Sequence, residues 1–238
     1  MPHGFTTRTA GVSAPPFDTL NLGRGVGDQL ESVGANRTRV AAALGRRLDD
    51  HVEASQVHGS VTAVVGAAHR GHTIDGADGL ATRDRRVLLA VHCADCVPIL
   101  LADPVRGAVA AVHTGWRGTA DGAAGAAVRT MADAFRSRSK DLLAAIGPAI
   151  GPCCYAVDAP VLERFARWPW RDRVLTPSGP GQWKLDLWEA NRTQLQEAGI
   201  PSDGIATAAL CTSCHPALFF SHRRDGRSGR MGALVTLP

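Results

Sequence analysis

Two cysteines and two histidines are gathered in one short segment of the chain, residues 92–118, which reads HCADCVPILLADPVRGAVAAVHTGWRG. Cys96 directly precedes one apolar run, and His113 follows the next one. Thiolate sulfur and imidazole nitrogen are the ligands that Zn²⁺ prefers in tetrahedral sites. The segment therefore predicts a metal site, provided that the two runs fold back on each other.

The sequence DPVR between the runs predicts that they do. Asp at the first position and Pro at the second are typical of a type I turn. If Asp103 pairs with Arg106, Cys96 lies directly opposite His113. A four-residue loop ending at Gly107 makes Cys96 and His113 a diagonal pair instead, about 7–8 Å apart at the backbone and within reach of one ion. Both registers place the thiol and the imidazole at the open end of one hairpin.

A third ligand must come from elsewhere, and His58 in SQVHGS is the candidate. It precedes a predicted strand, and the glycine after it permits close approach. Taken singly, a cysteine is as compatible with a small buried apolar residue, and a histidine with a hydrogen-bonded turn; the joint placement favours the metal. Three protein ligands leave one position open, as in catalytic zinc sites, whereas a zinc-stabilised module without activity requires four.

The remaining cysteines suggest other sites, each of which has a weakness. CTSCH, at residues 211–215, is typical of c-type haem attachment, but that chemistry requires export and no leader segment is evident. A Cys₄ zinc site built from both C-x-x-C pairs needs a loop of more than a hundred residues, far outside zinc-ribbon spacing. The adjacent pair in PCCY is expected to point one thiol inward and the other outward. No role is assigned to Cys93, Cys153, Cys154, Cys211, Cys214 or His215.

Arginines near the C-terminus could bind an anion. Arg223 and Arg224, in HRRDGRSGR, combine guanidinium groups with glycines that free backbone N–H groups, which suits phosphate oxygens; a solvated turn is the alternative. Arg117, in GWRG, lies next to the predicted metal site.

The whole sequence predicts a single α+β domain over residues 1–238, with mixed sheets flanked by helices. Helices are expected over 28–44 and 121–136, from Asp158, and from Asp186 to Gly199; strands are expected at 61–66, 86–91, 204–210 and 231–237. A net charge of +4 without a dense basic run argues against nucleic acid as a partner. The chain lacks a membrane segment, so a cytoplasmic protein with reduced cysteines is expected.

The order of motifs resembles the YfiH-type family, once labelled polyphenol oxidases or laccase-domain proteins and now regarded as zinc-dependent purine nucleoside phosphorylases. The resemblance spans nearly the whole chain. It rests on FDTLNLGRGVGD, SQVHG, ADGLAT, ADCVPILLADP, AVHTGWRGTA, IGPAIGPCCYAV, DLWEAN and FFSHRRDGRSGRMG.

The resemblance implies a fold similar to the catalytic domains of CNF-type bacterial toxins and the metal ligands His58, Cys96 and His113. It also implies phosphorolysis of adenosine, inosine and methylthioadenosine, together with deamination of adenosine. Such chemistry needs a proton shuttle, for which Asp78 and Asp95 are candidates. Phosphate needs cationic groups, a role for which Arg117, Arg223 and Arg224 are candidates. Small-molecule substrates and a monomer or weak homo-oligomer are expected.

Two other enzyme activities remain open. Multicopper oxidases need about ten histidines, mostly in H-x-H pairs, whereas this chain has nine histidines and no H-x-H, so polyphenol oxidation through Cu²⁺ is the weaker alternative. An editing hydrolase of peptidoglycan precursors would use the same metal or a free Cys96 to cleave an amide. Metal content distinguishes the metal-dependent hydrolase from the one that uses a free thiol, because Cys96 cannot be both a full metal ligand and a free nucleophile.

Overall fold

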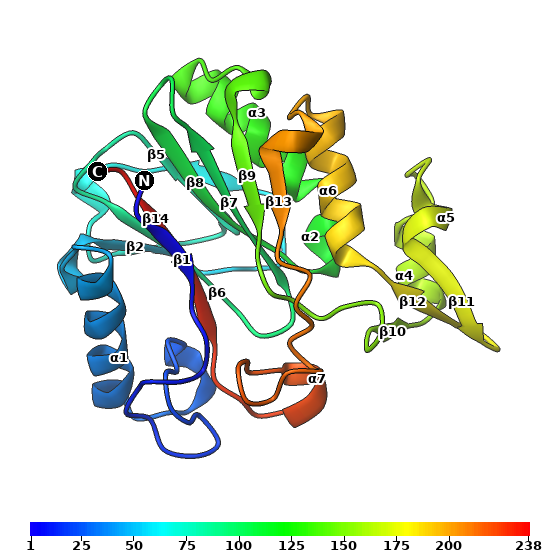
Figure 1. Cartoon of the computed structure of the whole chain (residues 1–238), viewed down its shortest axis with the longest axis horizontal. Helices are drawn as coiled ribbons and strands as arrows, with labels where there is room; N and C mark the ends of the chain where they lie inside the picture. The colour runs from blue at the N-terminus through cyan, green and yellow to red at the C-terminus, as the bar shows by residue number, and fades with distance from the viewer.

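Two β-sheets lie face to face in the middle of the molecule, in a computed structural model that describes all residues 1–238 (Figure 1). The five-stranded sheet has the order β1 (His3–Phe5), β14 (Met231–Thr236), β6 (Leu88–Cys93), β2 (His51–Ala54) and β4 (Thr73–Ile74). The six-stranded sheet has the order β13 (Ile205–Thr207), β9 (Leu143–Ile146), β7 (Val97–Asp103), β8 (Ala108–Thr114), β5 (Gly79–Thr82) and β3 (Thr62–Val64). Both sheets mix parallel and antiparallel pairs.

The central strands are apolar on both faces because each sheet is covered on both sides. In β6, Leu89 and Val91 belong to the core between the sheets, whereas Leu88 and Ala90 pack with Val40 of helix α1 (Leu30–Ala43). Successive side chains of a strand point to opposite faces, so a strand between two cores has a continuous apolar sequence. The outer layer on this side is α1.

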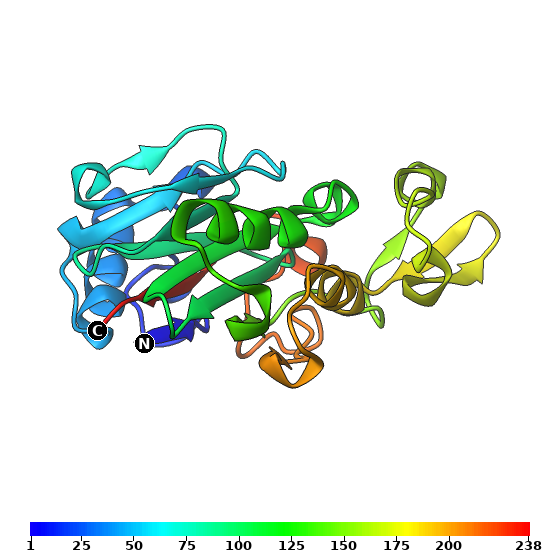
Figure 2. The same ribbon diagram turned by 90° about the horizontal axis from the view of Figure 1, so that it is seen from above.

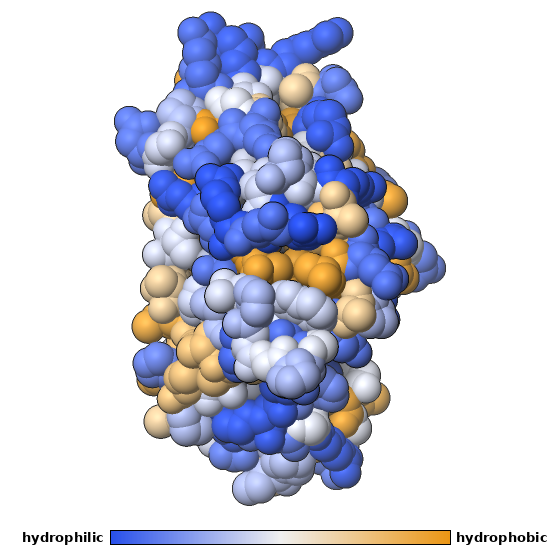
Figure 3. Space-filling view, turned by 90° about the vertical axis from the view of Figure 1, so that its right-hand side faces the viewer, coloured by the Kyte–Doolittle hydropathy of each residue, from blue (hydrophilic) through white to orange (hydrophobic).

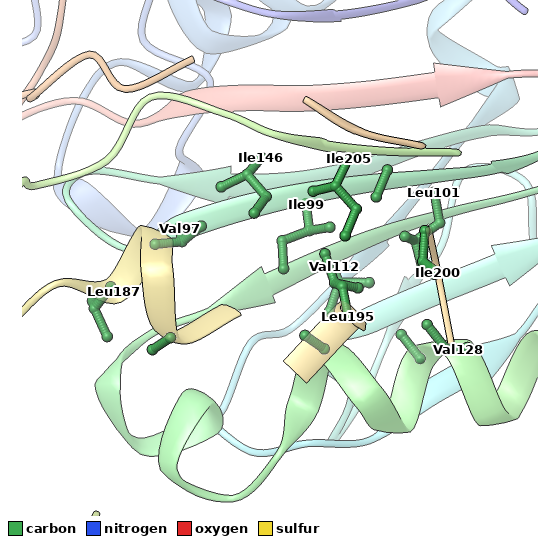
Figure 4. Packing of buried hydrophobic residues seen from close by; sticks show 14 of the residues in the cluster. Val97, Ile99, Leu101, Val112, Val128, Ile146, Leu187, Leu195, Ile200 and Ile205 are labelled. Atoms are coloured by element: carbon green, nitrogen blue, oxygen red, sulfur yellow. The ribbon is translucent and has the colours of Figure 1, made fainter. Parts of the chain in front are cut away.

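Helices cover the outer face of the six-stranded sheet (Figures 2 and 4). They are α2 (Trp116–Ala120), α3 (Ala123–Phe135) and α6 (Leu187–Glu197). Ile99 and Leu101 of β7 share a buried cluster with Val128 of α3 and Leu195 of α6. Asp186 caps α6 by accepting a hydrogen bond from the backbone N–H of Glu189 at 3.0 Å, as its sequence predicts.

A three-stranded sheet with two short helices projects from one end of the molecule (Figure 2). It contains β10 (Ala156–Val157), β12 (Gln182–Leu185), β11 (Leu175–Gly179), α4 (Ala159–Arg164) and α5 (Arg171–Val174). Its buried Phe165, Trp170 and Leu185 join the same cluster as the six-stranded sheet, so the projection belongs to the same folded unit. Seen from this end, the surface is mostly hydrophilic with a narrow apolar band across it (Figure 3).

The α+β class with mixed sheets and flanking helices is confirmed. The remaining elements are α7 (His222–Asp225) and the 3₁₀ turns Arg24–Val26, Leu48–Asp50, Ala67–His69, Ser139–Asp141 and Ser202–Gly204. None of the helices combines the length and the apolar character that a bilayer crossing requires.

Candidate metal centre

The hairpin of β7 and β8 has the register set by a four-residue loop. Pro98 pairs with His113 and Asp103 pairs with Ala108. Asp103 Oδ1 accepts hydrogen bonds from the backbone N–H groups of Val105 and Arg106 at 2.9 and 2.8 Å, and Gly107 has a φ of 63°. The pairing of Asp103 with Arg106 is therefore wrong. The Asp103 side chain closes a longer turn, in which Asp103 pairs with Ala108. Cys96 and His113 form the diagonal pair.

His58, Cys96 and His113 meet at this end of the hairpin. One ligand atom from each residue lies within 4.8 Å of the other two. Cys96 Sγ is 4.0 Å from His58 Nε2, and the two imidazole rings meet edge to face with centroids 5.0 Å apart. Sulfur and nitrogen bound to one tetrahedral Zn²⁺ are about 3.6 Å apart, by the usual bond lengths. The donor set has the chemistry of such a site, and the distance from Cys96 Sγ to His58 Nε2 would need to close by only a few tenths of an ångström.

Asp78 fixes the two histidines of the trio. Its Oδ1 accepts hydrogen bonds from His113 Nδ1 and from the backbone N–H of His58, each at 2.9 Å. Its Oδ2 accepts from the backbone N–H groups of Val57 and Gly59 at 3.1 and 2.7 Å. Because Nδ1 of His113 donates to Asp78, Nε2 is the ring atom left for a metal.

The charged groups around Cys96 favour its thiolate form. Burial alone would raise the pKa of Cys96, but His113 and His58 hold it below its ordinary value. Burial alone would lower the pKa of His113, but Cys96 and Asp78 raise it. Burial likewise opposes ionisation of Asp78, whose pKa the hydrogen bonds from His113 and the backbone keep low. Thiolate is the form of cysteine that binds metals.

Backbone shape completes the centre and was not anticipated from the sequence. His58 has a left-handed φ of 61°, which turns its ring toward the hairpin. At Gly115, a Cβ atom would lie 2.9 Å from His58 Cδ2 and 3.1 Å from Cys96 Sγ. The glycine of HTGW was the available signal, since only a residue without a side chain leaves room for both ligands.

The three ligands line a cleft of about 640 Å³, a size typical of small-molecule sites. Arg24 and Arg230 line the same cleft, and neither was singled out in the sequence. Arg24 is exposed. Arg230 is half-buried, and this burial lowers its pKa, although the group stays cationic at neutral pH. A third arginine of the cleft, Arg37, is ion-paired with Glu53, so Arg24 and Arg230 are the cations that the cleft places with the candidate metal ligands.

The arginines that the sequence did single out lie elsewhere. Arg117 is exposed and stacks on Trp116, 4.4 Å from the ring centre. Arg223 stacks on Tyr155 at 4.9 Å, donates to the carbonyl of Ala156, and lines a second cavity of about 370 Å³. Burial and the charge of Cys96 raise the pKa of Tyr155, which lines this second cavity, to about 12.

Arg224 and Asp95 are occupied by structural contacts. Arg224 donates to Asp225 and to the carbonyls of Thr212, Ser213 and Phe219. Asp95 accepts from the hydroxyl of Thr212 and from the backbone N–H of Arg223, each at 2.6 Å. These contacts tie the segment after residue 211 to the residue preceding Cys96.

The prediction that Cys153 and Cys154 point in opposite directions is wrong. Their thiols join those of Cys211 and Cys214 in one group, with all four sulfur atoms within 4.8 Å of one another. Cys93 is buried and lies apart from this group. The sequence did not pair these segments because about sixty residues separate them.

The chain matches a protein family over residues 2–238, and the description of that family is multi-copper polyphenol oxidoreductase laccase. Among solved structures, the hypothetical protein YfiH of Bacillus licheniformis has a TM-score of 0.97 and 41% identity, over 99% of this chain and 92% of that one. YlmD of Geobacillus stearothermophilus has a TM-score of 0.94 and 43% identity, over 99% of this chain and 91% of that one. The chain belongs to this laccase-like, YfiH-type family.

Curated relatives carry a different functional name. The Geobacillus stearothermophilus protein named purine nucleoside phosphorylase YlmD is 44% identical over 98% of this chain and 88% of its own length. A Deinococcus radiodurans protein named purine nucleoside phosphorylase is 40% identical over 100% of this chain and 90% of its own length. The resemblance recognised in the sequence is confirmed at the level of the family.

Proposed function

We propose that this protein is a zinc-dependent purine nucleoside phosphorylase. The observation that carries the proposal is the convergence of His58, Cys96 and His113 at the wall of a cleft that is also lined by arginines. The names of the relatives support the reaction type. A three-ligand zinc leaves a position for substrate, and Zn²⁺ bound there would supply Lewis-acid chemistry.

In phosphorolysis, a phosphate oxygen forms a bond to ribose C1′ while the bond from C1′ to the purine nitrogen breaks. The nucleophile is an anion, so the chain must hold it against the sugar. Arg24 and Arg230 line the cleft without a carboxylate partner, whereas Arg37 is paired with Glu53. We therefore assign phosphate binding to Arg24 and Arg230. Arg223, which was a candidate for that role, lines the neighbouring cavity and stacks on Tyr155. Arg117, a second such candidate, stacks on Trp116, which lines the same cavity.

The two carboxylates act by positioning. All four acceptor positions of Asp78 are filled by N–H donors, so it orients His113 and the His58 loop rather than moving a proton. Asp95 holds Thr212 and the backbone of Arg223. Both carboxylates therefore affect turnover through the groups they fix.

Deamination belongs to the same proposal. Here water forms a bond to C6 of the purine while the bond from C6 to the amino nitrogen breaks, so that adenosine plus water gives inosine plus ammonia. The cleft wall formed by the three ligands would serve both reactions, with the purine ring turned toward the metal for deamination.

The test is to incubate the zinc-loaded protein with adenosine, with and without phosphate, and to separate the products. Adenine and ribose 1-phosphate that form only with phosphate support phosphorolysis, and inosine formed without it supports deamination. Unchanged nucleosides would overturn the proposal. Amide cleavage of a muramyl precursor or oxidation of a phenol by the copper-loaded protein would then indicate one of the alternatives.

The phosphate site is tested separately with Arg24→Ala. We expect the KM for phosphate to rise about tenfold with a small change in kcat, as for the loss of one charged contact. Arg85→Ala is the matched control, because Arg85 is exposed and lies outside the cleft. Equal phosphate KM values in both variants would contradict the assignment of Arg24.

A further inference from the structure

The cluster of Cys153, Cys154, Cys211 and Cys214 lies where two distant turns are joined. A parallel β-bridge pairs Ala149 with Cys211, and the backbone N–H of Thr212 donates to the carbonyl of Ala149 at 3.0 Å. The first turn, residues 151–154, thereby meets the second, residues 211–214. This pairing brings the thiols of the two turns together.

The four sulfur atoms are grouped closely enough for a metal tetrathiolate, and two of their distances are near the expected edge length. Cys214 Sγ is 3.6 Å from Cys153 Sγ and 3.4 Å from Cys154 Sγ. Four sulfurs bound to one Zn²⁺ at 2.3 Å are about 3.8 Å apart along each tetrahedral edge, whereas a disulfide requires about 2.05 Å. All four cysteines are free. Four thiolates in tetrahedral arrangement select zinc among the abundant divalent ions.

The groups around the four cysteines can stabilise the negative charge of four thiolates bound to one metal ion. The backbone N–H of Gly151 donates to Cys211 Sγ at 3.3 Å, which stabilises the thiolate. The ammonium of Lys184 donates to the carbonyl of Cys153 at 3.2 Å, and Arg224 donates to the carbonyls of Thr212 and Ser213. Four thiolates and one Zn²⁺ carry a net charge of −2, which the ammonium of Lys184 offsets in part, whereas Arg224 is already paired with Asp225.

Close packing on one side and exposure on the other provide both rigidity and access. At Gly151 a Cβ atom would lie 2.7 Å from the ring of Trp188, so the turn lies directly on that side chain. His215 Nδ1 lies 2.8 Å from the carbonyl of Cys211 and closes the second turn. Cys153 and Cys214 are exposed, which gives an ion a path into the cluster.

We infer that Cys153, Cys154, Cys211 and Cys214 bind a second, structural Zn²⁺. Binding releases one proton from each thiol, four in all, and no oxidation takes place. With four protein ligands the site is closed, so it has no position for a substrate. Its role is to lock the turn that carries Thr212, whose hydroxyl donates to Asp95. This inference does not depend on the catalytic proposal, since the two sites share no ligand.

Zinc content, measured by elemental analysis of protein purified with a thiol reductant, tests the inference. We expect two zinc ions per chain in the wild type and in Ser213→Ala, a control in the same turn that changes no ligand. One ion should remain in Cys214→Ser and one in Cys96→Ala. If Cys96→Ala holds none, or Cys214→Ser holds as much as the wild type, the second site does not exist. One ion in the wild type that survives in Cys96→Ala and is lost in Cys214→Ser would uphold this site while refuting the catalytic one.

A spectroscopic measurement covers the case in which Cys214→Ser fails to fold. Cobalt-loaded Cys96→Ala should show the intense sulfur-to-cobalt charge-transfer absorption of a tetrathiolate, and Cys153→Ser on the same background should lose it. Absence of that absorption from Cys96→Ala would overturn the inference. So would a Cys154–Cys214 crosslink, found by mass spectrometry of peptides from freshly purified, metal-free protein.

Discussion

The His58, Cys96 and His113 group and the group of four cysteines differ in the secondary structure that holds their side chains. His58, Cys96 and His113 stand at the end of a hairpin in the six-stranded sheet and line a cleft of about 640 Å³. The four clustered cysteines belong to two turns joined by one bridge, and they line no part of that cleft. The number of ligands follows the same division. Three ligands facing a cleft leave room for chemistry, whereas four ligands in facing turns leave room only for the ion.

Loss of a ligand at the hairpin should have the largest effect. His113→Ala removes a buried ligand and leaves Asp78 without its ring partner, so metal is lost from the cleft. We expect turnover to fall about 1,000-fold or more, equivalent to the several kcal/mol that a metal supplies. Steady-state phosphorolysis measures this, with Ser213→Ala as the control at full activity. If His113→Ala keeps both its zinc and its rate, the hairpin group does not bind a catalytic metal and is not distinguished in this way from the four cysteines.

Asp78→Asn should have the next largest effect, and it affects the hairpin site alone. An amide in place of the carboxylate brings its own N–H groups toward the donors of His113 and the His58 loop. We expect zinc affinity at the cleft to fall 10- to 100-fold, as for other partners behind a metal-bound histidine. Competition with a chelator measures the affinity site by site. Equal weakening of the tetrathiolate ion would show that the two centres are coupled.

Gly115→Ala tests how closely the ligands must approach. The added methyl group would press on His58 and Cys96, so we expect zinc affinity to fall about tenfold while the melting temperature changes little. Gly179→Ala is the control, because nothing lies within 4 Å of a Cβ atom there. Binding unchanged by Gly115→Ala would mean that the ion sits elsewhere.

The smallest effect concerns the strand that forms one wall of the cleft. His51 opens β2, and both of its ring nitrogens are buried without a hydrogen-bond partner. Burial lowers its pKa from 6.5 to about 4. The unfolded chain therefore binds the proton more readily, and stability falls as the pH decreases from about 6.5 to about 4.

At pH 5.5 this cost is about 1 kcal/mol relative to pH 8. His51→Leu should remove it and flatten that part of the profile, measured by urea unfolding across the pH range. The same substitution at exposed His72 should leave the slope intact. An unchanged slope in His51→Leu would assign the acid sensitivity to another group.

Local sequence predicted the parts of the structure that local interactions determine. The Asp186 cap, the bounds of α1 and α3 to within two or three residues, and the Cys96–His113 hairpin follow from capping, periodicity and turn chemistry. The exact register required knowing whether the Asp103 side chain would close a longer loop. Both registers were compatible with the residues, so the sequence alone left that choice open.

Long-range pairing produced what the sequence did not predict. The grouping of Cys154 with Cys214 depends on the bridge between Ala149 and Cys211, which no local pattern encodes. Arg24 reaches the cleft because its turn lies beside Arg230, some two hundred residues later in the chain. Contacts of this kind are set by the packing of whole sheets, so the cleft was incomplete at the level of sequence.

One measurement tests the central claim most directly: an anomalous difference map, collected at the zinc absorption edge from crystals of the purified protein. The account predicts a peak about 2.3 Å from Cys96 Sγ and about 2.0–2.1 Å from one ring nitrogen of His58 and of His113, with its fourth side facing the cleft. No peak among these three residues, or a peak enclosed by a fourth protein ligand, would contradict it.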